Sequence, residues 1–264
     1  MTNIGVLRAA YDTQLRRVVP THRPPGIRYE LLGPVLRVVG RNRGFLETGP
    51  RVGVAGAELD ALITLHRDFF AARGETVEWK TRSHDEPAAL TARLLAAGFV
   101  PEDRETVVVA ETERLSTEPV LPAGVTLRRA VDRADFDRIA VMQTQVWGED
   151  HTWLADELES SVRDAPHDVL VFIAEADGLV VSSCRLEFVP GTEFAGLWGG
   201  STLPDWRGLG IYRALVAHRA ALAAARGVRY LQVDASDESK PILVRLGFQA
   251  ITTTTPYVFT PSRC

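Results

Sequence analysis

Apolar residues recur at helical spacing in some segments of the chain and alternate with polar residues in others. The helical spacing predicts helices over 1–20, 55–73, 86–97, 135–147, 152–162, 211–226 and 239–246. The alternating runs predict strands over 27–32, 35–39, 44–48, 76–81, 105–110, 125–130, 168–175, 179–188, 193–203, 229–233 and 249–260. Between two of these strands, Asp177-Gly178 is a strong signal for a type I′ hairpin, and Gly33-Pro34 marks a second hairpin. The pattern as a whole predicts an α/β (α+β) fold.

Two parts of the sequence carry the same landmarks in the same order. Each has a His-Arg pair, an Arg-Gly pair, a strand, a helix and a Gly-Phe pair; these are His66-Arg67, Arg73-Gly74 and Gly98-Phe99, then His218-Arg219, Arg226-Gly227 and Gly247-Phe248. We interpret them as a diverged internal repeat; the alternative is that helix–strand–helix–strand order recurs by chance. The prediction is an N-terminal domain over 1–115, a linker with Pro119 and Pro122 over 116–124, and a C-terminal domain over 125–264.

Composition narrows the function. A net charge of −4 gives no general reason to expect nucleic-acid binding. No apolar run approaches the roughly 18 residues needed to span a bilayer, and no secretory leader is evident, so a cytoplasmic location without membrane attachment is expected. Cys184 and Cys264 are too few for a disulfide framework, and Cys184 is expected to be a buried small hydrophobe. The histidines are scattered, which predicts no metal site.

The most informative stretch is the glycine-containing loop from Arg207 to Tyr212, which reads Arg-Gly-Leu-Gly-Ile-Tyr. It lies between a predicted strand and the long helix predicted over 211–226. A helix N-terminus exposes about four unpaired N–H groups and the positive end of the helix dipole. Glycines there let the backbone surround an anion, so the loop predicts a phosphate or pyrophosphate site, with charge added by Arg207 and Arg213. The alternative is a glycine-rich connection that only turns a corner.

This loop resembles the pyrophosphate loop of the GNAT acyltransferases, which bind acetyl-CoA. Their pattern is Arg/Gln-x-x-Gly-x-Gly/Ala, and the family's downstream Leu-Gly-Phe appears as Leu246-Gly247-Phe248. Tyr212 stands where the family has Gly or Ala. The resemblance covers roughly 123–260 and implies the GNAT acyl-CoA N-acyltransferase fold, a mixed, mostly antiparallel sheet flanked by helices, here in two tandem halves. The first half has Arg51-Val-Gly-Val-Ala-Gly56 in place of the loop, so no CoA site is expected there.

The resemblance also implies which residues contact acetyl-CoA. The pyrophosphate would lie on the loop residues Arg207, Gly208, Leu209, Gly210, Ile211, Tyr212 and Arg213. The pantetheine arm would pair with the backbone of the preceding strand at Gly200, Ser201 and Thr202, although Gly199-Gly200 could instead only form a bulge. Ser236 and Ser239 stand near the position of a family Asn that contacts CoA; Ser239 is equally well explained as a helix cap.

The implied reaction is direct attack of a primary amine of a small molecule or peptide on the thioester. Glu193 and Glu187 are the candidate bases, each with the alternative of being a solvated strand residue. Many relatives place a proton-donating Tyr where this chain has Leu243. Trp147, Glu149 and Asp150, in the connection between two helices, are the candidate substrate residues, because acids and aromatic rings attract a cationic amine. The alternative for these three is a polar turn with buried tryptophans.

The resemblance therefore predicts an acetyl-CoA-dependent N-acetyltransferase, working as a monomer or homodimer. The missing Tyr and the Tyr212 replacement keep an alternative open, a non-catalytic acyl-CoA-binding regulatory or scaffold protein.

Overall fold

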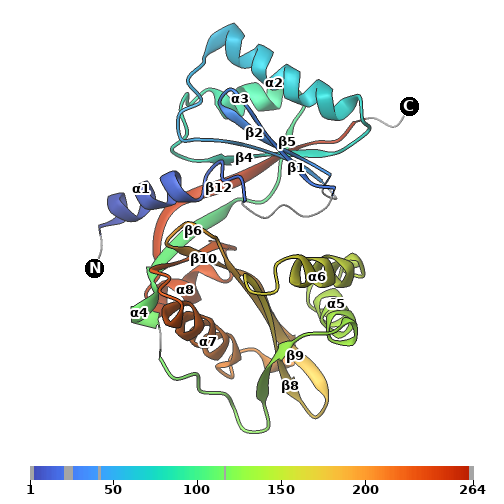
Figure 1. Cartoon of the computed structure of the whole chain (residues 1–264), viewed down its shortest axis with the longest axis vertical. Helices are drawn as coiled ribbons and strands as arrows, with labels where there is room; N and C mark the ends of the chain where they lie inside the picture. Colours follow the sequence, from blue (N-terminus) through green and yellow to red (C-terminus); the bar gives the residue numbers. More distant parts are fainter. Residues whose placement is uncertain (1–2, 21–25, 41–42, 116, 262–264) are drawn as a thin grey trace. The chain divides into compact units, whose positions relative to one another are not determined.

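The structure, a computed structural model, describes residues 3–20, 26–40, 43–115 and 117–261. The chain folds into two compact units (Figure 1). Unit 1 comprises Met1–Val108, Asp234–Val244 and Gln249–Cys264, and unit 2 comprises Val109–Val233 and Arg245–Phe248. The sequence prediction placed all of 125–264 in one domain, whereas unit 1 also includes two C-terminal segments.

The sheet of unit 1 contains both antiparallel and parallel strand pairs. Its elements are α1 (Ile4–Gln14), β1 (Arg28–Leu32), β2 (Val35–Val39), β3 (Gly44–Thr48), α2 (Gly56–Ala71), β4 (Val77–Arg82), α3 (Leu90–Ala96), β5 (Val100–Pro101), α8 (Lys240–Leu246) and β12 (Gln249–Phe259). Strands β1, β2 and β3 pair antiparallel in order, β3 pairs parallel with β4, and β12 pairs antiparallel with β4 and β5. Boundaries between the two units fall within the strand β6 (Glu105–Glu111), within β11 (Tyr230–Ala235) and within α8.

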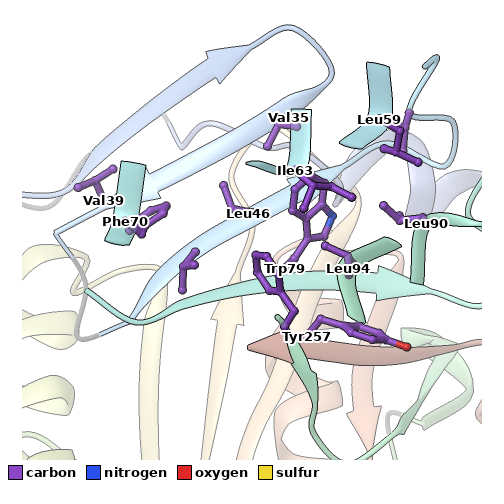
Figure 2. Close-up of a cluster of buried hydrophobic side chains, with 13 residues drawn as sticks. Val35, Val39, Leu46, Leu59, Ile63, Phe70, Trp79, Leu90, Leu94 and Tyr257 are labelled. Atoms are coloured by element: carbon purple, nitrogen blue, oxygen red, sulfur yellow. The ribbon is translucent and has the colours of Figure 1, made fainter. Parts of the chain in front are cut away.

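The apolar core of unit 1 lies between its sheet and helices α2 and α3 (Figure 2). Trp79 of β4 is fully buried at its centre, with Phe99 edge-on to it at a centroid separation of 6.4 Å. Leu59, Ile63 and Phe70 recur along α2 at helical spacing, which is why this segment forms a helix with one face buried.

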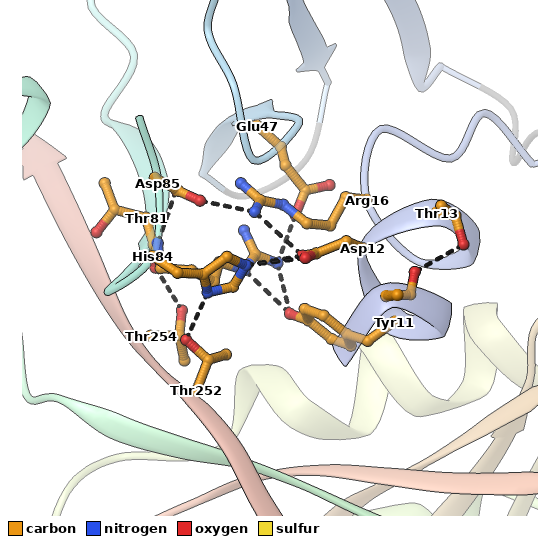
Figure 3. A network of polar contacts seen from close by, with 12 residues as sticks. Tyr11, Asp12, Thr13, Arg16, Glu47, Thr81, His84, Asp85, Thr252 and Thr254 are labelled. Atoms are coloured by element: carbon orange, nitrogen blue, oxygen red, sulfur yellow. Dashed lines mark hydrogen bonds and ion pairs between the residues drawn. The ribbon is translucent and has the colours of Figure 1, made fainter. Parts of the chain in front are cut away.

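A second cluster, made of polar side chains, connects α1 and the residues after it to the sheet of unit 1 through ion pairs and hydrogen bonds (Figure 3). The Arg82 guanidinium forms an ion pair of 2.6 Å with Glu47 and donates to the Tyr11 hydroxyl at 2.9 Å. Arg16 reaches Asp85 at 2.7 Å. Burial raises the pKa of Tyr11 to about 12, so this hydroxyl stays protonated and neutral. Because each of these charges has a partner of opposite sign, the cluster is compatible with burial.

Unit 2 is a sheet covered by helices on both faces (Figure 1). Its elements are α4 (Thr112–Leu115), β7 (Thr126–Ala130), α5 (Arg133–Trp147), α6 (Trp153–Asp164), β8 (Val169–Ala176), β9 (Leu179–Phe188), β10 (Phe194–Thr202), a 3₁₀ turn (Pro204–Trp206), α7 (Ile211–Ala225) and β11 (Tyr230–Ala235). Strands β7 to β10 pair antiparallel in chain order, and β10 pairs parallel with β11. Helices α5 and α6 lie on one face of this sheet and α7 on the other (Figure 1).

The predicted hairpins are confirmed. Asp177 and Gly178, between β8 and β9, have φ values of 49° and 78°, which is the conformation of a type I′ turn. Leu32 pairs directly with Val35 across Gly33-Pro34. Cys184 of β9 is buried, as expected, and Cys264 lies outside the described residues.

The landmarks of the sequence repeat adopt the same backbone conformation in both copies. After α2, the amide of Glu75 donates to the carbonyl of Phe70 and Gly74 donates to Ala71; after α7, Val228 donates to Ala223 and Gly227 to Ala224. Both hydrogen-bond pairs have the same sequence offsets, and Gly74 and Gly227 both have a positive φ. This is the Schellman ending of a helix, formed in each copy at the predicted glycine.

The structure differs from the predicted elements at several places. The helix predicted over 1–20 ends at Gln14. Helix α3 begins at Leu90 rather than 86, because Glu86 is held in extended backbone: its amide donates to Pro50 O and its carbonyl accepts from Val52, both at 2.8 Å. Just before the predicted linker over 116–124, the chain forms the short helix α4, which the sequence did not predict; it packs against α7 and is anchored by Thr112 N donating to Arg229 O.

Candidate functional site

The loop between β10 and α7 has the geometry of an anion site. Gly208 and Gly210 have φ values of 76° and 88°, a conformation that L-residues with side chains adopt only with strain. A Cβ added at either glycine would meet no atom within 4 Å, so the space in front of both is open. The first turn of α7 contains no acidic side chain. The unpaired N–H groups of this turn therefore have an open approach with no negative side chain on the helix to oppose an anion.

The two arginines of the loop differ in their contacts. Arg207 is exposed, and its Nε donates to the carbonyl oxygen of Thr202 at 3.1 Å, so it ties the loop to the end of β10. Arg213 is exposed in the first turn of α7. Tyr212, next to it, is half-buried, and burial raises the pKa of its hydroxyl.

The strand leading into this loop has one free edge. Strand β10 pairs with β11 only at Phe194–Gly196, and beyond that point no strand among the described residues covers the same edge. The backbone from Leu197 to Thr202, which includes the predicted Gly200, Ser201 and Thr202, therefore presents N–H and C=O groups along an open edge.

On its other edge, β10 carries a bulge opposite Cys184. Trp198 pairs with Arg185 and Ser201 with Ser183, so one extra residue is inserted in β10 across Gly199 and Gly200. Gly199 has a φ of 58°. Gly199 and Gly200 therefore form a bulge, which lies in the segment with the free edge, and the contact of Gly200 with a pantetheine arm stays a prediction.

The bulge is held by one buried side-chain amide, that of Gln143 on α5. Its Nε2 donates to Gly199 O and Ser183 Oγ, both at 3.2 Å, and its Oε1 accepts from Ser201 Oγ at 2.9 Å and Trp147 Nε1 at 2.8 Å. An amide has two donor hydrogens and two acceptor lone pairs, so Gln143 uses its full hydrogen-bonding capacity. Because a trans peptide is planar, holding Gly199 O toward α5 turns the N–H of Gly200 away from α5.

The predicted substrate residues fall into two groups. Trp147 is brought to the bulge, since its indole N–H also lies 3.2 Å from Ser201 Oγ. Glu149 and Asp150 are exposed in the turn that follows. The carboxylate of Asp150 accepts from the backbone N–H of Thr152 at 2.9 Å, and hydrogen bonds from Thr152 lower the pKa of Asp150. Asp150 therefore stabilises the turn before α6.

The two candidate bases lie at different places on the sheet. Glu193 immediately precedes β10, roughly 23 Å along the strand from Gly200 at 3.3 Å per residue, and pairs with Arg229 at 3.3 Å. Glu187 of β9 pairs with Arg185 Nε at 3.0 Å. Because Arg185 lies opposite Trp198, next to the bulge, the geometry favours Glu187 over Glu193.

Three further residues named from the sequence lie in unit 1. Ser236 and Ser239 precede α8, with their hydroxyls 3.2 Å apart and Ser239 Oγ near the carbonyl of Ser236 at 3.3 Å. These bonds close a local turn, and the contact of either serine with a cofactor stays a prediction. Leu243 is fully buried in α8 and is apolar.

The corresponding loop of unit 1 is less suited to an anion. Gly53 and Gly56 also have positive φ, but the first turn of α2 carries the acidic Glu58. A carboxylate at a helix N-terminus competes with a bound anion for the same positive potential.

Gln143 and the lining of a nearby cavity were not predicted from the sequence. The signal for Gln143 was present: it continues the buried face of α5 formed by Phe136, Ile139 and Ala140, where an apolar residue is the norm. The cavity, of about 190 Å³, lies between α5, α6 and the sheet of unit 2 and reaches the bulge at Gly199.

Within the described ranges, no cluster of three or more His, Cys, Asp or Glu side chains is arranged to hold a metal ion. The described helices also include none with the length and apolar character required to cross a membrane.

Comparison with known proteins agrees with this geometry. The chain is similar in structure to a GCN5-related N-acetyltransferase from Kribbella flavida (TM-score 0.69, 18% identity, covering 95% of this chain and 94% of that one). It is also similar to a GCN5-related N-acetyltransferase from Sphaerobacter thermophilus (TM-score 0.63, 19% identity, covering 87% of this chain and 81% of that one). A third similar structure is a tandem GNAT protein from the clavulanic acid biosynthesis pathway (TM-score 0.62, 16% identity, covering 92% of this chain and 86% of that one). At these identities the likeness establishes the fold. A search of curated protein sequences found no match. Residues 134–248 match the model of the acetyltransferase (GNAT) family.

Proposed function

We propose that the protein transfers an acetyl group from acetyl-CoA to a primary amine of a small molecule or peptide, using one CoA site in unit 2. The observation that carries the proposal is the junction of β10 and α7. Two glycines with positive φ and open space lie at the N-terminus of a helix whose first turn lacks acids, directly after a strand with a free edge. The pyrophosphate would be held by the amides from Gly208 to Arg213, with Arg213 adding charge.

The free edge of β10 suits the rest of the cofactor. The pantetheine arm contains amide groups, which can pair with the backbone of Gly200 to Thr202 as an added strand would. The Gly200 N–H, which Gln143 orients through the Gly199 carbonyl, is a donor within this stretch. These assignments leave unit 1 without a CoA site, in agreement with Glu58 at its loop.

The chemistry that acetyl-CoA supplies is a thioester carbonyl carbon, to which the amine nitrogen bonds as the carbon–sulfur bond breaks. Starting from the ammonium, the nitrogen loses two protons: one passes to a base and on to solvent before the attack, and the other is gained by the departing thiolate, so the transfer is balanced without a further reactant. A primary alkylamine has a pKa near 10.4 and must be deprotonated before it attacks. Of the two carboxylates considered, we assign the role of base to Glu187, with Glu193 as the alternative.

One observation favours a second function. Leu243 cannot donate a proton, and it stands where many members of the family place a Tyr. A protein that binds acyl-CoA without turnover, as a regulatory or scaffold protein, would have the same loop and need no proton donor. Release of free thiol with a panel of primary amines distinguishes turnover from binding alone.

The direct test is calorimetric titration with acetyl-CoA of the wild-type protein and two variants. Gly210→Asp puts a side chain and a negative charge into the loop and should abolish binding. Gly178→Asp is the matched control, since Gly178 also has a positive φ and open space but lies in the β8–β9 hairpin. We expect one site per chain, retained in Gly178→Asp and lost in Gly210→Asp. Absence of binding at millimolar acetyl-CoA, or wild-type affinity in Gly210→Asp, contradicts the proposal.

A further inference from the structure

The cavity of unit 2 has apolar walls and a polar rim. Its volume is about 190 Å³. The walls are the side chains of Ile139, Leu154, Leu158 and Val171. Gly199 and Ser183 lie at its end by the bulge, and Trp153, Glu157 and Arg185 also line it. His151 and Trp153 of the lining belong to the 147–153 connection in which the sequence placed the candidate substrate residues, whereas Trp147, Glu149 and Asp150 do not line the cavity. The cavity is therefore a candidate site for the acceptor.

The volume limits what the cavity holds. A cavity of about 150 Å³ lined by apolar side chains accommodates a benzene molecule. The cavity here is somewhat larger, which leaves room for a six-membered ring or an equivalent aliphatic chain with a short arm. The four residues named above are hydrocarbon, and Gln143, which also lines the cavity, already uses its full hydrogen-bonding capacity. The other hydrogen-bonding side chains of the lining include those of His151, Ser183, Glu157 and Arg185.

The charges at the cavity favour a cation. Arg185 lies between two carboxylates, with Nη1 3.3 Å from Glu157 and Nε 3.0 Å from Glu187. Two carboxylates sharing one guanidinium leave one net negative charge. The Glu157 side chain is 47% exposed and that of Glu187 is 34% exposed, so Glu157 is the more accessible of the two carboxylates.

Three further titratable groups lie near these charges: Cys184 and His151 in the lining, and Arg219 behind the sheet. Burial raises the pKa of the Cys184 thiol, which stays neutral. His151 lies with Nδ1 2.8 Å from the carbonyl oxygen of Glu149, and its ring stacks on Trp153 at a centroid separation of 5.9 Å. Behind the sheet, Arg219 is buried and bonds through Nη1 to the backbone carbonyl of Arg185 rather than to a carboxylate.

We propose that this cavity binds the acceptor, a primary ammonium on a compact apolar skeleton of about the size of a phenyl ring with a short arm, and that Glu157 receives the ammonium. The apolar skeleton lies against α5 and α6, where burying it removes hydrocarbon from water. The transfer of acetyl to the bound amine rests on the proposed function, whereas the binding of the amine does not.

The test is calorimetric titration without CoA, using 2-phenylethylamine, its uncharged counterpart 2-phenylethanol, and spermidine, a polyamine without an apolar ring. We expect 2-phenylethylamine to bind at least tenfold more tightly than either of the others. Glu157→Gln should weaken binding of 2-phenylethylamine at least tenfold and leave 2-phenylethanol unchanged. Glu159→Gln is the matched control, because Glu159 lies on the same helix but pairs with Arg133 and does not line the cavity.

Each other outcome overturns part or all of the inference. Equal affinity for 2-phenylethylamine and 2-phenylethanol excludes charge recognition, and equal effects of the two Gln variants exclude Glu157. No binding of any probe at millimolar concentration removes the site. The result is separable from the proposed function: acetyl-CoA binding without amine binding refutes only the acceptor cavity, and amine binding without acetyl-CoA binding refutes only the acetyltransferase.

Discussion

The ring of Tyr212 lies against the backbone of Gly200: a Cβ added at Gly200 would stand 3.0 Å from Tyr212 Cε2. These residues belong to α7 and to the bulged strand β10. Tyr212 occupies the position where the family pattern has Gly or Ala, and the absence of a side chain at 200 is what gives its ring room. The tyrosine at 212 and the glycine at 200 thus form one packing contact, at the strand edge where the pantetheine arm is proposed to bind.

The first prediction concerns this contact. Gly200→Ala should displace the Tyr212 ring and weaken acetyl-CoA binding, while the double variant Gly200→Ala/Tyr212→Ala should regain much of the loss. Residues in direct contact typically show coupling energies of about 0.5–3 kcal/mol. Calorimetry on the two single variants and the double variant measures this coupling. Additive effects would show that the contact does not shape the site.

A second prediction concerns Gln143. Replacing it by Leu leaves Gly199 O, Ser183, Ser201 and Trp147 without this partner, and unsatisfied buried groups cost about 1–3 kcal/mol each. We expect Gln143→Leu to lower the free energy of unfolding in urea and to increase amide hydrogen exchange in the 197–202 segment at least tenfold. Gln145→Leu is the control, since Gln145 is exposed on the same helix. Unchanged exchange at 197–202 would mean that the bulge holds its conformation without the amide.

The third prediction concerns His66, whose ring is fully buried in unit 1 with no hydrogen-bond partner for either nitrogen among the described residues. Burial lowers the pKa of His66 to about 4 from 6.5. Below pH 6.5, His66 takes up a proton in the unfolded chain but stays neutral in the folded chain. The contribution of His66 to the free energy of unfolding is therefore fully present above that pH and is lost as the pH drops toward 4. The loss is on the order of 3 kcal/mol.

Chemical denaturation between pH 7.5 and 4 of the wild type and His66→Leu checks this dependence. The wild type should lose stability relative to the variant as the pH falls. The comparison is with the variant because Glu105, whose pKa burial raises to about 7, contributes the opposite slope in both proteins. His167→Leu, at an exposed position, is the control. Parallel curves for wild type and His66→Leu would exclude a buried neutral imidazole.

Local signals predicted most of the elements. The Asp177-Gly178 turn, the strand Gly44–Thr48 and the start of α7 at Ile211 are set by residues adjacent in sequence, and all three agree with the structure. The start of α3 was wrong because Glu86 is bonded to the backbone of residues 50 and 52, a partnership that no local pattern records. The family match of residues 134–248 includes the loop and the Leu-Gly-Phe motif, both of which are continuous in the sequence.

The candidate site was predicted only where it is local. The anion loop is one continuous stretch, so its glycines and its helix could be recognised together. The bulge network joins Gln143, Ser183 and Gly199 from three elements, and the cavity joins residues from α5 to β10. A side chain that satisfies its hydrogen bonds through distant partners looks, in the sequence, like an isolated polar residue on an apolar helix face.

The grouping of β12 with unit 1 bears on the order in which the chain can fold during synthesis. Strand β4 leaves the ribosome with the first 108 residues, yet its antiparallel partner, Gln249–Phe259, follows only after the whole of 109–233. At a synthesis rate of about 5–20 residues per second, the partner strand is made on the order of ten seconds after β4. Unit 2 has its own core and sheet assembled from an almost uninterrupted stretch, so the part of the chain translated second can be the first to complete its fold.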